Sequence, residues 1–257
     1  MLLKKKVTDM MNFNRENDLL IIPDVHGRGF WRDAVNDTPY AHVVFLGDYV
    51  DPYPHEGIFP EEALDVMKEI VDFARSHRST TTLLIGNHDM HYKSTPFRRM
   101  AGGTRYNSMM RPQIYEMMEA NKDLFTLAFE AECGGVHCLL THAGVASGWL
   151  HKYESLVGEP TAESLNALLD TPEGIIALAD IGWCRGGGAL VGGPLWADYS
   201  EMSKEVPLPG IYQIFGHTQK LGNTPWVNEH LACLDCHRAF LLTEVLEMAH
   251  LLPSANG

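Results

Sequence analysis

The sequence predicts a mixed α/β (α+β) fold in which two packed, mixed β-sheets are covered by helices. Short apolar runs alternate with amphipathic stretches in the first half of the chain, and further apolar runs cluster near its end. The alternation favours parallel strands joined by helices, and the later cluster favours a second sheet. With 257 residues, 45% of them hydrophobic, the chain can bury a sizeable core. We expect one domain over residues 1–257, with residues 1–17 as a flexible N-terminal segment.

Seven apolar runs are the candidate strands. The first five run into polar, glycine-rich loops, as buried strands do, and they span residues 19–23, 42–47, 82–86, 136–141 and 212–216. Two later runs, at 230–234 and 239–245, predict a closing pair of strands near the end of the chain.

The clearest helix is predicted from Pro60 to about Arg78. Pro60 suits the first helical turn, and Glu61 and Glu62 suit the positive end of the helix dipole. Apolar residues then recur at helical spacing. Further helices are expected over residues 111–132, 162–169 and 172–180, and the stretch 185–210, rich in Gly and Pro, is expected to be a loop.

Charge and composition exclude some classes of partner. The formal net charge is −13, so the surface repels nucleic-acid polymers and anionic membranes. We find no apolar run of membrane-spanning length and no apolar segment typical of a secretory signal behind the N-terminal lysines. Five cysteines, an odd count, fit a reduced compartment, so we expect a cytoplasmic protein. The sequence does not indicate an oligomeric state.

Potential metal ligands follow each of the first five apolar runs. They are Asp24 and His26, then Asp48 and Asp51, then Asn87, His88 and Asp89, then His142, and finally His217. Ligands of α/β sheets bind at the carboxyl ends of the strands, so side chains from five loops can converge there. Any one group is common in turns, but turn chemistry gives histidine no reason to recur. Mixed oxygen and imidazole ligands suit Mn, Fe or Zn.

The five groups resemble those of the calcineurin-like metallophosphoesterase superfamily. They read Asp-Val-His-Gly, Gly-Asp-Tyr-Val-Asp, Gly-Asn-His-Asp, Thr-His-Ala-Gly and Gly-His-Thr over residues 24–218. The first, second and last, with Leu-Trp-Ala-Asp at 195–198, are similar to the phosphoprotein-phosphatase branch. That branch includes bacterial and phage Ser/Thr protein phosphatases and the symmetrical diadenosine tetraphosphatases. The resemblance implies a four-layer α/β/β/α sandwich with two packed mixed sheets.

The resemblance also implies two divalent metal ions, with Mn expected and Fe or Zn as alternatives. The implied ligands are Asp24, His26 and Asp48 for one ion, and Asp48, Asn87, His142 and His217 for the other. Two such ions can share a water and lower its pKa toward neutrality, which prepares a hydroxide to attack phosphorus in line.

A proton must also reach the leaving alkoxide. His88, next to Asn87, is the candidate general acid, and Asp51 would orient it as a carboxylate beside a histidine does. The alternatives for His88 are a further metal ligand or a structural histidine. The alternative for Asp51 is a helix cap or turn residue.

The second motif lacks one arginine of the protein-phosphatase pattern. Those phosphatases continue Val-Asp-Arg-Gly and grip the substrate phosphate with the arginine, whereas this chain continues with Pro52 and Tyr53. A glycine-flanked arginine in a loop can bind a phosphate bidentately. The candidate substitutes are Arg185 first, then Arg105, and then the pair Arg98 and Arg99.

Two further positions bear on the branch of the family. Asp89 ends the third motif, where protein phosphatases usually have Glu and the tetraphosphatases have Asp. Gln219 stands where many other branches have the second histidine of Gly-His-x-His. His91, soon after the third motif, is a candidate to line the pocket. Cys233, Cys236 and His237 match a haem-attachment spacing, which we set aside because no export signal accompanies it, leaving a redox or zinc pair as the minor alternative.

Three functions remain open on the sequence. The favoured one is a dinuclear-metal phosphatase that hydrolyses phosphate monoesters, as a Ser/Thr-type protein phosphatase does. The alternative is a nucleotide phosphohydrolase acting on a dinucleoside tetraphosphate or a phosphodiester. A non-catalytic scaffold of the same fold is weakest, because no implied ligand is missing. The expected partner is therefore a phosphorylated substrate, either a phosphoprotein or a small phosphoester.

Overall fold

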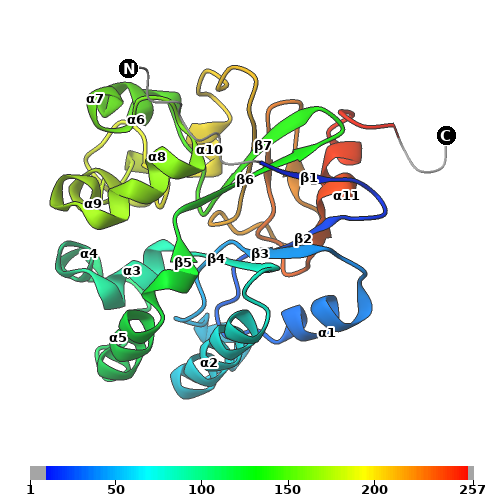
Figure 1. Cartoon of the computed structure of the whole chain (residues 1–257). Helices are drawn as coiled ribbons and strands as arrows, with labels where there is room; N and C mark the ends of the chain where they lie inside the picture. Colours follow the sequence, from blue (N-terminus) through cyan, green and yellow to red (C-terminus); the bar gives the residue numbers. More distant parts are fainter. Residues whose placement is uncertain (1–9, 254–257) are drawn as a thin grey trace, which may run out of the picture.

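The computed structural model describes residues 10–253, which form two facing β-sheets enclosed by helices (Figure 1). The five-stranded sheet has the order β11-β2-β3-β4-β5, with β2 Leu19–Ile22, β3 His42–Phe45, β4 Thr81–Leu84, β5 Phe125–Thr126 and β11 Phe240–Leu241. The six-stranded sheet has the order β1-β6-β7-β8-β10-β9, with β1 Met11–Phe13, β6 Ala128–Cys133, β7 Val136–Thr141, β8 Tyr212–Phe215, β9 Trp226–Val227 and β10 Leu231–Cys233.

Eleven α-helices occur in the described residues: α1 Phe30–Asp37, α2 Pro60–Ser76, α3 Asn87–Lys93, α4 Thr95–Met100, α5 Arg111–Ala120, α6 Ser147–Lys152, α7 Glu154–Val157, α8 Ala162–Asn166, α9 Pro172–Leu178, α10 Tyr199–Met202 and α11 Leu242–Met248. Short 3-10 turns cover η1 Pro54–Glu56, η2 Lys122–Leu124, η3 Ala167–Asp170 and η4 Trp183–Arg185. Within residues 10–253, no helix combines the length and the apolar character needed to cross a membrane.

Alternation along the central strands sorts apolar side chains into layers. Leu19 and Ile21 of β2 pack with Ile214 of β8 between the two sheets. The intervening residues Leu20 and Ile22 face the opposite way and join the core beneath α2. Figure 1 shows α1 and α2 over that outer face, and α8 and α9 lie by the other sheet. The predicted four-layer α/β/β/α arrangement is confirmed.

The predicted helix over residues 111–132 is wrong beyond Ala120. Residues 125–133 instead supply β5 and β6, and β6 pairs antiparallel with β7. The connecting residues Gly134 and Gly135 have φ of 59° and 81°, which side chains rarely adopt, so this glycine pair permits the tight hairpin.

The predicted strand over residues 239–245 is also mostly wrong. Only Phe240–Leu241 pairs with β2, and α11 begins at Leu242. Leu242, Val245 and Leu246 are buried at helical spacing, a period that the apolar run hides. Residues 11–13, expected to be flexible, form β1 beside β6, while residues 1–9 of that segment lie outside the described part of the chain.

The parallel pairing of strands sets the position of the polar loops. β2, β3, β4 and β5 run parallel to one another, as do β7, β8 and β10 in the other sheet. The carboxyl ends within each of these parallel groups therefore share one edge of their sheet. The loops after β2, β3, β4, β7 and β8 carry the five polar groups singled out in the sequence.

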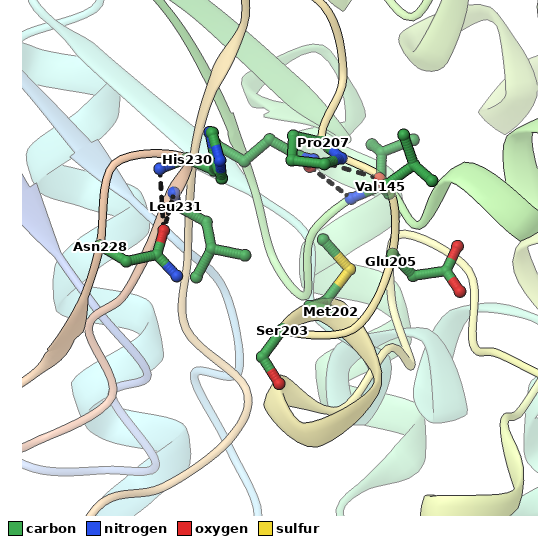
Figure 2. A pocket seen from close by; sticks show the side chains of 10 residues that line it. Val145, Met202, Ser203, Glu205, Pro207, Asn228, His230 and Leu231 are labelled. Carbon is green, nitrogen blue, oxygen red and sulfur yellow. Dashed lines mark hydrogen bonds between the residues drawn. The ribbon is translucent and has the colours of Figure 1, made fainter.

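Gln213 of β8 fastens that strand to the loop after β7. Its side chain accepts the Val145 N–H at 2.8 Å and donates to the Val145 carbonyl at 3.2 Å. Both bonds end at Val145, which Figure 2 shows with Met202 and His230, two other residues that line the same pocket. Because Val145 is fully buried, water cannot replace Gln213.

We predict that Gln213→Ala lowers the free energy of unfolding by about 2 to 4 kcal/mol, because it leaves two buried backbone groups unpaired. Urea denaturation of the metal-free protein measures the change. Gln113→Ala, at an exposed position of α5, is the control and should change stability by no more than about 0.5 kcal/mol. Equal stability of the two variants would contradict the role assigned to Gln213.

Candidate active site

Tight turns carry the polar groups at the strand ends. His26, Asp48, Asp51 and His217 all have positive φ, between 45° and 64°, in the left-handed region that non-glycine residues seldom adopt. Such strain persists only where the surroundings enforce it, and it is concentrated at functional sites. The loops are therefore shaped to aim these side chains rather than to minimise backbone energy.

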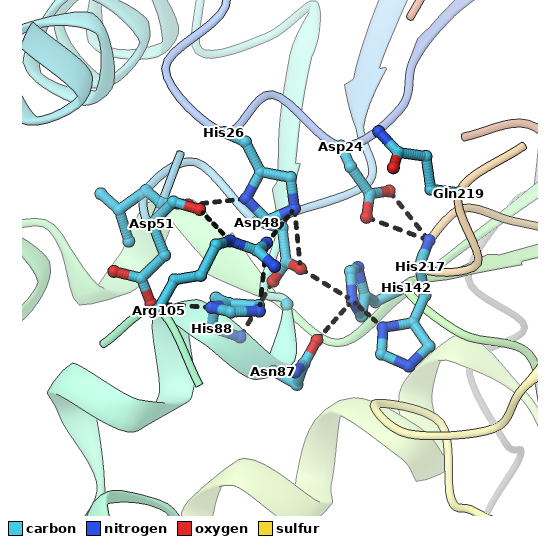
Figure 3. Close-up of polar contacts among 12 residues, drawn as sticks. Asp24, His26, Asp48, Asp51, Asn87, His88, Arg105, His142, His217 and Gln219 are labelled. Atoms are coloured by element: carbon cyan, nitrogen blue, oxygen red, sulfur yellow. Dashed lines mark hydrogen bonds and ion pairs between the residues drawn. The ribbon is translucent and has the colours of Figure 1, made fainter. Parts of the chain in front are cut away.

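Two sets of buried ligand atoms meet at Asp48. One set is Asp24, His26 and Asp48, and the other is Asp48, His142 and His217, each with ligand atoms within 4.8 Å of one another. Asp48 Oδ2 lies 3.6 Å from His26 Nε2 and 3.5 Å from His142 Nε2. Figure 3 shows Asp48 between the two groups. A carboxylate in this position can serve both sets.

The candidate ligand atoms are arranged to bind a cation rather than to hydrogen-bond with one another. The Nδ1 atoms of His26 and His142 lie 2.7 and 2.9 Å from the carbonyls of Val50 and Leu46, so each Nδ1 carries the proton and each Nε2 keeps a lone pair. His142 Nε2 then faces Asn87 Oδ1 at 3.0 Å and a ring nitrogen of His217 at 3.1 Å. Oxygen and imidazole nitrogen atoms that converge in this way can hold a cation between them.

Burial sets the protonation of these groups. It lowers the pKa of His26 and His217 well below the usual value, and it lowers the pKa of His142 as well. Burial also raises the pKa of Asp48 well above its ordinary value, and the charges of Asp24 and Asp89 raise it further. The imidazoles are therefore neutral at physiological pH and free to bind metal, while the crowded carboxylates favour a positive ion nearby.

His88 and Asp51 form a hydrogen-bonded pair beside the two sets. His88 Nδ1 lies 2.7 Å from Asp51 Oδ2, while the Tyr92 hydroxyl donates to the other Asp51 oxygen. The Tyr92 oxygen in turn accepts the Asn107 N–H at 3.0 Å. Tyr92 was not singled out in the sequence, although its place four residues after His88 puts both on one face of α3.

Asp89 connects the second and third motifs. Its carboxylate accepts N–H groups from Asp48, Tyr49 and Gly86 at 2.8, 3.0 and 2.8 Å. A Cβ atom on Gly86 would lie only 2.1 Å from Asp48 Oδ1, so the third motif can approach Asp48 only with glycine there. Asp89 thus positions the backbone of Asp48 without itself facing the pocket.

Two arginines line the cavity of about 210 Å³ above this centre. Arg105 donates to the Asp51 carbonyl at 2.7 Å, and its guanidinium lies 3.7 Å from the centre of the Tyr53 ring. Arg185 pairs with Asp198 at 2.9 Å and donates to Thr218 Oγ1 at 2.8 Å. The structure thus brings both leading arginine candidates to the cavity.

The remaining candidates lie elsewhere. Arg98 and Arg99 lie on α4 and are not among the cavity-lining residues. His91 is fully buried beside His88 and Trp196 and does not line the cavity either, contrary to expectation. Cys233 and Cys236 are both free thiols rather than a disulfide.

The chain belongs to the calcineurin-like phosphoesterase family, whose model matches residues 18–221. It is therefore a phosphoester hydrolase by family, and the family uses a dinuclear metal site for which this chain has candidate ligand groups. No curated protein sequence matches the chain.

Two solved phosphatase structures superpose on most of this chain. A cold-active protein tyrosine phosphatase superposes with a TM-score of 0.52 and 16% sequence identity, covering 91% of this chain and 75% of that chain. A protein serine/threonine phosphatase from Saccharomyces cerevisiae gives a TM-score of 0.48 and 14% identity, covering 88% and 70%. At such low identity, the first likeness establishes a shared fold and no more.

We predict that Asp89→Asn destabilises the metal-free protein by about 2 to 4 kcal/mol, because an amide cannot accept three N–H bonds with one oxygen. Thermal and urea unfolding measure the loss. Asp72→Asn on α2, where the aspartate side chain is 74% exposed, serves as the matched control and should be close to neutral. A neutral effect of Asp89→Asn would refute its role as the clamp between the motifs.

Proposed function

We propose that this phosphoesterase is a dinuclear-metal phosphatase that removes phosphate monoesters from phosphorylated protein side chains. The observation that carries the proposal is the pair of buried ligand sets that share Asp48 and lie beside His88 and two arginines. A nucleotide phosphohydrolase is the alternative, and Asp89, the residue that the tetraphosphatases have at this position, is the feature that favours it.

The proposed metal ligands follow from the two sets. Asp24, His26 and Asp48 would hold one ion, and Asp48, Asn87, His142 and His217 would hold the other. We expect Mn, with Fe or Zn as alternatives, because the ligands mix carboxylate, amide and imidazole. When bound, the ions supply positive charge to the phosphoryl group and acidify a water molecule.

The two arginines give the cavity an anion-binding wall. Pro52 and Tyr53 replace the usual Arg-Gly of the second motif, and Tyr53 forms the surface on which Arg105 stacks. Arg105 and Arg185 are each fixed by their other contacts, so little side-chain freedom is lost when they bind a phosphate oxygen. We infer that they bind the phosphoryl group together.

His88 is the proposed general acid. Asp51 accepts from its Nδ1, and Nε2 faces the cavity 3.4 Å from the Arg105 guanidinium, so Nε2 is the nitrogen placed for proton transfer. The hydrogen bond to Asp51 fixes the orientation of the ring from which a proton would pass to the leaving oxygen. Tyr92 holds Asp51 from the far side and thereby fixes the His88 ring.

We predict that the metal-stripped protein is inactive and that added Mn²⁺ restores hydrolysis of p-nitrophenyl phosphate in preference to bis-p-nitrophenyl phosphate. A phosphopeptide should then be a better substrate than a dinucleoside tetraphosphate, because two arginines supply charge for one phosphoryl group rather than four. Initial rates measured at equal substrate concentrations show which substrate is preferred. Preference for the diester or the dinucleotide would favour the alternative, and no turnover with Mn²⁺ bound would favour a scaffold.

We predict that His88→Asn retains both metal ions but lowers kcat on a phosphoserine peptide by about 100-fold or more, as loss of a general acid does. The kcat on an aryl phosphate should fall much less, because its leaving group needs little protonation. Rates on both substrates, with metal content checked in each sample, test the assignment. His230→Asn, at an exposed position away from the cavity, is the control. Equal losses of kcat on the two substrates would contradict the general-acid role of His88.

A further inference from the structure

Asp235 lies in the loop after β10, next to the loop that carries His217. β10 pairs parallel with β8, so its carboxyl end lies beside that of β8. Leu234 N–H donates to the Phe215 carbonyl at 2.8 Å, and Lys220 N–H donates to the Asp235 carbonyl at 2.8 Å. Asp235 therefore occupies a sixth strand-end loop, in line with the five that form the candidate site.

The same backbone also holds Asp24. His217 N–H donates to both Asp24 oxygens, at 2.9 and 3.1 Å. A Cβ atom on Gly216 would lie 2.0 Å from Asp24 Oδ1, which shows how closely this carboxylate is pressed against the loop. Asp24 and Asp235 thus flank one short stretch of chain, and among neighbouring charges Asp24 acts most strongly on Asp235.

Asp235 differs from the other buried carboxylates because no hydrogen-bond donor among the described residues reaches its side chain. Its side chain is 1% exposed, and neither oxygen has a partner among the described residues. Asp18, by contrast, accepts from the Leu19 N–H and the Thr243 hydroxyl, and Asp89 accepts three N–H groups. A buried carboxylate without a partner costs several kcal/mol as an anion, so it is either protonated or balanced by a cation.

The nearby arginines are engaged elsewhere. Arg28 makes hydrogen bonds with both oxygens of Glu56, at 2.8 to 3.1 Å, and donates to the Asp24 carbonyl. Arg185 pairs with Asp198. Both arginines act on Asp235 only through space, while burial raises its pKa well above the ordinary value. No cationic side chain of the described residues therefore hydrogen-bonds Asp235.

The first metal set, Asp24, His26 and Asp48, has fewer protein ligands than the second. It contains three protein ligands, and Gln219 stands where other branches have a further histidine. Gln219 Nε2 lies 2.6 Å from His237 Nε2, so its amide is engaged with His237. An extra negative charge beside Asp24 would strengthen the hold of this set on a divalent ion.

We propose that Asp235 is a further carboxylate of the metal centre, which stabilises the ion held by Asp24, His26 and Asp48. Among the described residues, Asp235 is in none of the sets whose ligand atoms lie within 4.8 Å of one another. It therefore acts on the ion through its charge and is not a direct ligand. It is a positioning residue in the sense that it acts on the bound ion rather than on substrate. The inference rests on the metal site of the proposed function.

Asp235→Asn tests this with metal affinity and thermal stability rather than turnover. Calorimetric titration of the metal-stripped full chain with Mn²⁺ should show one of two sites weakened about 10- to 100-fold. The metal-free Tm should stay the same or rise, because the amide removes a buried charge, and the rise in Tm caused by Mn²⁺ should shrink. Asp18→Asn, at a buried carboxylate away from the site, should instead lower the metal-free Tm and leave both affinities unchanged.

Two results would overturn the proposal. One is two Mn²⁺ sites of wild-type affinity in Asp235→Asn with an unchanged metal-free Tm, and the other is the same two affinities with a lower metal-free Tm, which is the behaviour expected of Asp18→Asn. Asp235→Ser, which leaves room for a water molecule, repeats the titration if the asparagine variant does not fold. Failure of the wild-type chain to bind Mn²⁺ would count against the proposed function itself and is distinct from either result.

Discussion

The arrangement of the site depends on how one buried carboxylate, that of Asp48, is held. Its backbone N–H is fixed by Asp89, and one of its oxygens accepts the His88 N–H at 2.9 Å. The other oxygen lies between His26 and His142. Because the backbone fixes Asp48 from two neighbouring loops, the two ligand sets are placed relative to each other before any ion binds.

Repulsion between buried carboxylates connects the charges of the site with its metal binding. Asp48 and Asp235 are each buried near Asp24, while His26, His142 and His217 are held neutral by burial. Negative charge is thereby concentrated where a cation would relieve it. Folding stability and metal binding are coupled in such a site, since the metal-free protein bears the unrelieved repulsion.

The sequence predicted the layers of the fold, and the convergence of the polar groups at the strand ends, better than it predicted the element boundaries. The convergence of Asp24, His26, Asp48, Asn87, His142 and His217 could be expected because each follows an apolar run, a pattern that local sequence carries. The tail of the predicted 111–132 helix failed because residues 125–133 pair with a distant strand, which no local period reveals. Tyr92 and Asp235 were missed for a similar reason, since each acts through a contact with another loop.

The most direct test of the shared Asp48 carboxylate is electron paramagnetic resonance of the metal-stripped chain reloaded with Mn²⁺. The account predicts two Mn²⁺ ions per chain whose spins are magnetically coupled, because one carboxylate serves both ligand sets. Asp48→Asn should lose the coupling even where Mn²⁺ still binds. A wild-type spectrum of isolated, uncoupled Mn²⁺, or a stoichiometry of one ion per chain, would contradict the dinuclear centre.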